Sequence, residues 1–201
     1  EVLMVVAEEM RVQGDNEAAD IVEVSLDCYL RSSEWSKLRY EDVVEVTPPD
    51  NGPNETILRY GVAERGESTK TGMRQGSRVD YPHTQQILHE RKQAVKPGNK
   101  IFTLKPAMFR AIWNATGERF GLDLGPPHTL RHSGPSADIA TNYRTMWQVQ
   151  RRGRWGSEKS VLRYAKTHAY YEAMAKIPTN IMTRGQTIMA ARENRPQTAR
   201  E

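Results

Sequence analysis

Apolar side chains recur every three or four positions in several stretches of the chain. This spacing places them on one face of an α-helix, so each stretch predicts an amphipathic helix. The stretches are residues 2–12, 17–31, 84–95, 105–120, 133–143 and 145–151. The expected inward face of the fourth stretch consists of Met108, Phe109, Ile112 and Trp113. The chain is therefore expected to be mainly helical.

A different period appears between the second and third of these helices. Residues 42–47 alternate apolar and polar side chains, as one strand of a sheet does, and residues 56–62 read as a second strand after a turn rich in Pro, Asn and Gly. A third strand is predicted between residues 68–72 and 78–81, which places Lys70 at or near a hairpin. The fold class predicted is α+β, mainly helical, with a small three-stranded antiparallel sheet.

Arg31 stands at the junction between two predicted helices. The next helix is short, and Ser32 or Ser33 can cap it. This junction lies beside the core, where a buried arginine needs a partner. Glu34 is three residues further on and can be that partner.

Composition limits the class of protein. The chain has 201 residues, enough for one domain with a core and short extensions, and 37% hydrophobic and 27% charged residues are typical of a globular protein. A single cysteine, Cys28, excludes an internal disulfide and a cysteine-cluster zinc site. No apolar run approaches the ~20 residues of a membrane span. The segment after Glu1 lacks the features of a signal peptide, and the absence of an initial methionine suggests a fragment.

Charge is distributed unevenly along the chain. Residues 1–64 hold 15 acidic and 5 basic side chains, a net charge of −10, whereas residues 65–201 hold 10 acidic and 24 basic ones, a net charge of +14. A basic segment of this size suits a polyanion such as nucleic acid. The alternative is a solvated basic surface with no such partner.

Residues 128–164 contain side chains that suit phosphodiester chemistry. His128 and Arg131 form a His-x-x-Arg motif, Trp155 lies in a Gly-Arg-Trp-Gly turn, and Tyr164 is predicted on the apolar face of a helix that Ser157 can cap. A tyrosine can attack phosphorus, and an arginine fork matches phosphate oxygens. Each residue also has a structural alternative: a helix cap for the histidine, core packing for the tryptophan, and a half-buried helix position for the tyrosine.

Two earlier segments complete an ordered set of motifs. Leu30-Arg31-Ser32-Ser33-Glu34-Trp35 has the form Leu-Arg-x-x-Glu-hydrophobic, and Lys70 belongs to the predicted hairpin. The His-x-x-Arg motif follows, and then Trp155 and Tyr164, nine residues apart. Over roughly residues 17–176 this set resembles the catalytic domain of tyrosine recombinases, the phage-integrase family, in its Cre-like form with Trp. Gly134-Pro135 departs from the family pattern, which usually begins a smoother helix there.

The resemblance implies a set of site residues and their roles. The residues it assigns to catalysis are Arg31, Lys70, His128, Arg131, Trp155 and Tyr164, with Glu34 and His132 in support. The arginines and the indole N–H would bind the nonbridging phosphate oxygens, His128 would accept the tyrosine proton, and the hairpin lysine would protonate the 5′-oxygen. The side chains expected to contact the DNA backbone are Arg151, Arg152, Arg154, Lys159, Arg163 and Lys166.

The resemblance also implies a function. It indicates a site-specific recombinase or integrase of a mobile element, which cleaves and rejoins double-stranded DNA through a 3′-phosphotyrosine without metal, ATP or another cofactor. We expect a homotetramer on DNA, no membrane association, and a location inside the cell wherever the DNA is. Residues 1–176 would form the catalytic domain without the family's N-terminal DNA-clamp domain, and residues 177–201 a basic tail, flexible or docked on a neighbouring copy. The alternatives are a degenerate relative that only binds DNA and a type IB topoisomerase-like enzyme.

Overall fold

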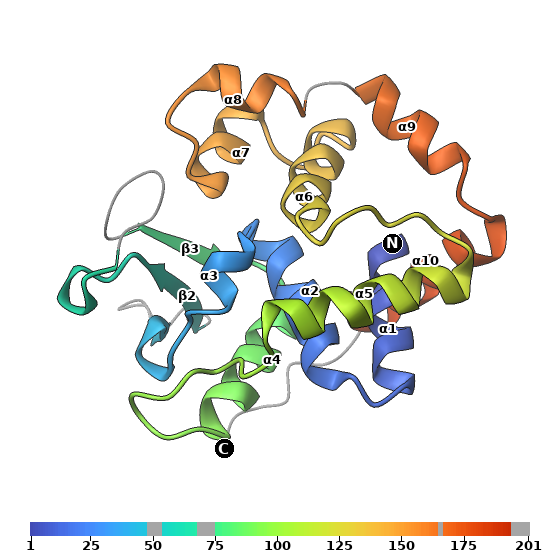
Figure 1. Cartoon of the computed structure of the whole chain (residues 1–201). Helices are drawn as coiled ribbons and strands as arrows, with labels where there is room; N and C mark the ends of the chain where they lie inside the picture. The colour runs from blue at the N-terminus through green and yellow to red at the C-terminus, as the bar shows by residue number, and fades with distance from the viewer. Residues whose placement is uncertain (48–53, 68–74, 165–166, 194–201) are drawn as a thin grey trace.

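The computed structural model describes residues 1–47, 54–67, 75–164 and 167–193. Within them the chain is mainly helical and carries one small sheet, which confirms the α+β class (Figure 1). The first half contains α1 (Val2–Val12), α2 (Asn16–Cys28), α3 (Ser32–Trp35), β1 (Val43–Val46), β2 (Glu55–Tyr60), β3 (Gln75–Val79) and α4 (Pro82–Gln93). The second half contains α5 (Pro106–Phe120), α6 (Thr129–Ala140), α7 (Met146–Gly153), α8 (Glu158–Leu162), α9 (Thr167–Ala175) and α10 (Thr179–Glu193). No helix in these described ranges combines the length and apolar character needed to cross a membrane.

The sheet is three-stranded and antiparallel, as predicted, and its strand order is β1-β2-β3. Leu58 lies in the middle strand, opposite Val43 on one side and Ser77 on the other. Leu58 and Val43 are buried in the main core, so this face of the sheet packs on the helices. The hairpin expected to carry Lys70 lies outside the described residues.

Helix α2 is the central element of the fold. It contacts α1, α4, α5, α6 and β3, and the predicted apolar face along it is buried. The helix ends at Cys28, three residues earlier than predicted, because Tyr29 adopts a left-handed conformation with φ of 51°. This early end turns the chain, so that Arg31 becomes the residue that precedes α3.

Helix α5 confirms its predicted position but not its whole inward face. Phe109 and Trp113 are buried, whereas Met108 is 56% exposed. Met108 lies one position before Phe109, about 100° away around the helix, and on this helix that position falls outside the face that meets the core.

Helix α6 begins at Thr129, four residues before the predicted start. Gly134 and Pro135 lie in the middle of this helix. A Cβ atom at Gly134 would lie 2.8 Å from the Leu26 carbonyl oxygen and 2.8 Å from a ring carbon of Tyr29. The glycine therefore lets α6 approach α2 closely, which gives the departure from the family pattern a packing reason.

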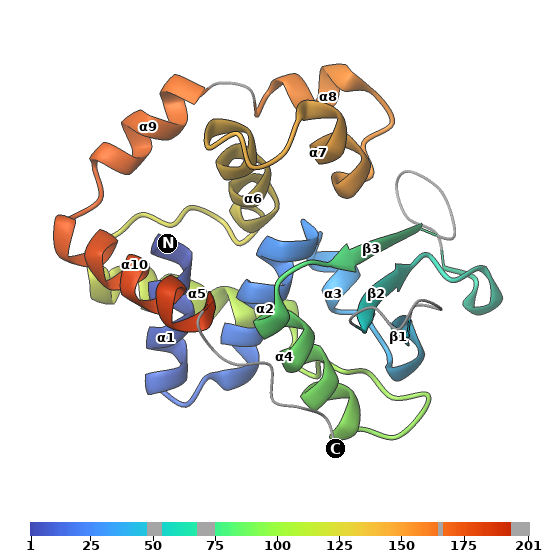
Figure 2. The same cartoon turned by 180° about the vertical axis from the view of Figure 1, so that it is seen from behind.

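The C-terminal segment that was expected to be flexible or docked on a neighbouring copy contains α10, over residues 179–193. This 15-residue helix packs against α1 of the same chain (Figure 2). The Arg192 guanidinium donates to Glu23 at 2.8 Å, and Ile181 is 6% exposed. A buried carboxylate needs cations around it, and the acidic N-terminal helices supply that carboxylate.

Candidate functional site

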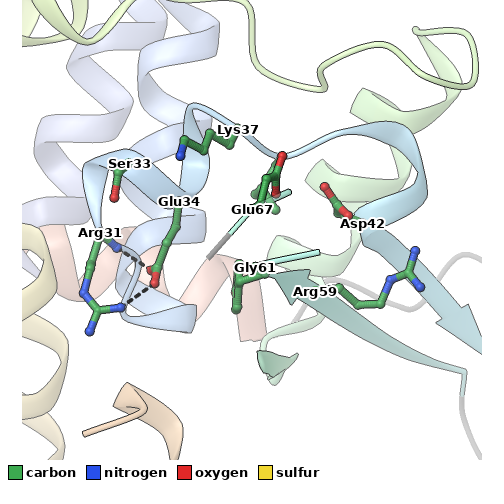
Figure 3. Close-up of a pocket in the computed structure, with 10 residues that line it drawn as sticks. Arg31, Ser33, Glu34, Lys37, Asp42, Arg59, Gly61 and Glu67 are labelled. Atoms are coloured by element: carbon green, nitrogen blue, oxygen red, sulfur yellow. Dashed lines mark hydrogen bonds and ion pairs between the residues drawn. The ribbon is translucent and has the colours of Figure 1, made fainter. Parts of the chain in front are cut away.

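Glu34 lies at the centre of the candidate site. Its carboxylate accepts hydrogen bonds from the backbone N–H and the guanidinium of Arg31, both at 2.7 Å (Figure 3). It also accepts one from the Arg154 guanidinium at 2.6 Å. The Arg131 guanidinium lies 3.9 Å from the same carboxylate. Glu34 is 6% exposed, so one buried anion holds three arginines in place.

Arg131 comes from the first turn of α6 and is buried. Its guanidinium donates to the Tyr29 carbonyl and, at 2.6 Å, to the Gly153 carbonyl. It also lies 4.8 Å from the centre of the Trp155 ring, in a cation–π contact. Burial and then the neighbouring Arg31 lower the pKa of Arg131 to about 10, which leaves the guanidinium charged at neutral pH.

Trp155 follows the tight turn that ends α7. An added Cβ at Gly153 would lie 1.8 Å from the indole, so only glycine leaves room for the ring. The ring centre is 6.2 Å from that of Tyr29 and 5.0 Å from that of Tyr164. The indole thus separates the arginine side of the site from the tyrosine side.

Tyr164 lies in a turn after α8, which ends at Leu162, so the predicted helical position of this tyrosine is wrong. Its hydroxyl is 2.7 Å from Nδ1 of His132. The side chain packs in a small core cluster and is 5% exposed. Burial raises the pKa of the phenol, while the positive charges of Arg131, Arg163 and Arg31 oppose that rise.

The two histidines of the site lie one helical turn apart. His128 is exposed at the start of α6, and its ring centre is 4.6 Å from that of His132 in an edge-to-face arrangement. Burial lowers the pKa of both imidazoles, and Arg131 lowers it further for both. Both rings are therefore neutral at pH 7 and able to accept a proton.

Seven of the eight residues predicted for catalysis and its support form one unbroken series of contacts. In order these are Arg31, Glu34, Arg131, Trp155, Tyr164, His132 and His128. They come from the α2–α3 junction, the start of α6 and the turns after α7 and α8. The eighth, Lys70, lies outside the described residues, and its role stays a prediction.

Two arginines predicted to contact the DNA backbone are committed to internal partners instead. Arg154 is 8% exposed and binds Glu34 and, at 2.5 Å, the Ser77 hydroxyl. Arg152 pairs with Asp27, and at 2.8 Å with Asp80. Both guanidiniums are engaged by carboxylates of the same chain, so contact with the DNA backbone requires these ion pairs to open, and the two contacts stay predictions.

The other predicted backbone contacts remain predictions. Arg151, Lys159 and Arg163 are exposed, and the Arg151 guanidinium lies 4.7 Å from the ring centre of Trp147, which is itself 62% exposed. Lys166 lies outside the described residues.

Sequence reasoning missed the residues that support the site from behind. The backbone carbonyl of Tyr29 accepts a hydrogen bond from Arg131, and the phenolic hydroxyl of Tyr29 donates one to Asp138. Asp138 also forms an ion pair with Arg144. Ser77, on β3, ties Arg154 to the sheet. The only signal in the sequence was an acidic residue, Asp138, within the helix predicted at residues 133–143; nothing pointed to the left-handed turn at Tyr29 or to Ser77.

A cavity of about 100 Å³ opens beside Arg31. In Figure 3, Arg31 and Glu34 lie at one end of it and Asp42 and Arg59 at the other. The walls thus mix both charges, which suits neither a simple anion nor a cation. Among the described residues, no group of three or more His, Cys, Asp or Glu side chains is placed to hold a metal ion.

Comparison with protein-family models and with curated proteins found no match for this chain. The geometry of the cluster is therefore the basis for inferring a function.

Proposed function

We propose that this protein cleaves and rejoins DNA as a tyrosine recombinase, with Tyr164 as the nucleophile. The observation that carries the proposal is the contact series from Arg31 to His128. It joins a nucleophile, a proton acceptor, an indole and two arginines from segments up to 133 positions apart in the chain. Core packing alone does not require two arginines to share one carboxylate beside a tyrosine–histidine pair.

The chemistry needs few groups because the difficulty is electrostatic. An anionic phosphodiester must accept an oxygen nucleophile, so catalysis depends on position and on charge stabilisation. Arg31 is anchored through Glu34 but keeps 16% of its side chain exposed, which suits contact with a nonbridging oxygen. Arg131 is more deeply buried than Arg31 and places a second positive charge close to the Arg31 guanidinium.

The covalent step balances without a metal or a nucleotide. The Tyr164 oxygen gives its proton to a histidine and forms a bond to phosphorus, the bond from phosphorus to the 5′-oxygen breaks, and that oxygen takes a proton from Lys70 or from water. The phosphodiester energy is kept in the 3′-phosphotyrosine, so a 5′-hydroxyl can reverse the step on a new strand. Exchange between two duplexes would place four copies of the chain on DNA.

One observation favours the second candidate, a relative that binds DNA without cutting it. Tyr164 is 5% exposed and its hydroxyl is engaged by His132. A nucleophile must reach phosphorus, so cleavage requires this side chain to become accessible when DNA binds.

Trapping of the covalent intermediate tests both candidates. The wild-type protein is incubated with a pool of nicked suicide duplexes that carry randomised central base pairs, and adducts are detected on a denaturing gel. We expect an adduct with wild-type protein and none with Tyr164→Phe, while DNA binding by the variant is unchanged. Tyr171→Phe, an exposed tyrosine of α9, is the matched control and should form the adduct. Binding of the pool by wild type without any adduct would support the non-cutting alternative and refute the enzyme.

A further inference from the structure

We propose that His132, rather than His128, accepts the Tyr164 proton during strand cleavage. This inference rests on the proposed function and assigns the general base within it. His132 Nδ1 is 2.7 Å from the Tyr164 hydroxyl, within the range for direct proton transfer. The His128 ring lies against the ring of His132, with 4.6 Å between their centres, and among the described residues the Tyr164 hydroxyl is hydrogen-bonded to His132 and not to His128. His132 therefore stands between His128 and the phenol.

The packing of the ring sets its role. The His132 ring lies 5.4 Å from the Tyr164 ring, with 34° between the planes, so the imidazole stays beside the phenol. For Nδ1 to accept from the hydroxyl, the neutral ring must carry its hydrogen on Nε2. This tautomer leaves Nδ1 with the free electron pair that a base requires.

The surrounding charges favour a neutral base and a phenolate. Burial lowers the pKa of His132, and the titratable and charged groups that face it lower that pKa further: His128 and Arg131 at the start of α6, and Arg163 after α8. The positive charges of Arg131, Arg163 and Arg31 also favour the phenolate, against the effect of burial. The same arginines thus keep the base unprotonated before the reaction and stabilise the nucleophile as it forms.

The proton follows a closed route through one full cycle. As the Tyr164 oxygen bonds to phosphorus, its proton moves to Nδ1 and gives an imidazolium. When a 5′-hydroxyl later attacks the phosphotyrosine, the Tyr164 oxygen leaves and takes the proton back from Nδ1. The 5′-oxygen exchanges its own proton with a separate donor, so His132 serves the tyrosine only.

Matched substitutions distinguish the two histidines. Asparagine places an amide near the Nδ1 position and keeps a hydrogen-bonding group, but it cannot carry the proton. We expect His132→Asn to slow adduct formation by about 10²–10⁴-fold, the usual range for a general base, and to remove the rise in rate that wild type shows through the titration of the imidazole below pH 6.5. His128→Asn, on the same helix, should keep that rise. The reverse pattern would overturn the proposal.

A modified substrate separates the base from the leaving-group acid. A duplex with a bridging sulfur at the 5′ position has a leaving group that needs no proton. If His132 acts on the tyrosine, this substrate will not rescue His132→Asn; rescue would assign His132 to the leaving group and overturn the inference.

A third measurement separates failure of this inference from failure of the proposed function. Nitrogen NMR of the free protein reports the tautomer of His132, and we expect an unprotonated Nδ1 in wild type that changes its signal in Tyr164→Phe. A protonated Nδ1 would overturn the inference even if adducts form. An unprotonated Nδ1 with no adduct on any duplex would refute the recombinase and with it the role of His132 as its base.

Discussion

Replacement of Arg154 with methionine should destabilise the protein by about 2–3 kcal/mol, although this arginine lies in a basic segment that looks exposed from the sequence. The guanidinium binds Glu34 at 2.6 Å, the Ser77 hydroxyl at 2.5 Å and the Cys28 carbonyl at 3.3 Å, and lies 4.4 Å from the ring centre of Tyr60. Methionine keeps much of the apolar volume and removes these polar contacts and the charge.

The magnitude follows from what is left behind. Loss of one partner of a buried ion pair lowers the free energy of unfolding by about 3–5 kcal/mol. Because Glu34 still has Arg31 and the nearby Arg131 as partners, we expect a loss of about 3 kcal/mol. Nε of Arg154 is buried and finds no acceptor among the described residues, so its removal returns about 1 kcal/mol. The residue also has φ of 56°, and Arg154→Gly should recover about a further 1 kcal/mol of backbone strain.

Urea unfolding followed by circular dichroism measures these differences. With an m-value of about 2 kcal/mol/M, the midpoint should fall by about 1–1.5 M for Arg154→Met and by less for Arg154→Gly. Arg151→Met, an exposed change three residues earlier, is the control and should shift the midpoint by about 0.25 M or less. Equal shifts for Arg151→Met and Arg154→Met would refute the buried role of Arg154.

Two further predictions concern the turn of the site and the C-terminal helix. Gly153→Ala should displace the Trp155 indole and reduce adduct formation by about 100-fold, measured by single-turnover trapping, while Gly156→Ala, where no described atom lies within 4 Å of the new Cβ, should leave the rate unchanged. Arg192→Met should cost about 1.5–3 kcal/mol at pH 7, since Arg192 binds the buried Glu23. Burial raises the pKa of Glu23, but His83 and its arginine partners lower it overall, so this stabilisation is present above the carboxyl's ordinary pKa and is lost as pH falls through the lowered value. Urea midpoints of the wild type and Arg192→Met should therefore converge in acid, and a gap that persists there would contradict the assignment.

The sequence by itself determined the elements and the order of the chemical motifs. Helix faces such as Phe109 and Trp113 on α5, and the alternation in β2, follow from the spacing of apolar residues a few positions apart, which is a local property. The pairing of Arg31 with Glu34 was predictable for the same reason, because three positions separate them.

Only the tertiary structure decided which of two similar residues is more buried and hydrogen-bonded and which is exposed. Arg151 and Arg154 are three positions apart in one basic run, yet one is exposed and the other is enclosed by α3 and β3. His128 and His132 are one helical turn apart, and the position of the turn after α8 places Tyr164 beside the second. Within each pair the two residues have the same charge type and similar neighbours along the chain, so the local sequence does not distinguish them. Their burial and hydrogen bonding depend on segments more than 30 positions away for His132 and more than 100 positions away for Arg154. The packing of the whole core brings those segments together.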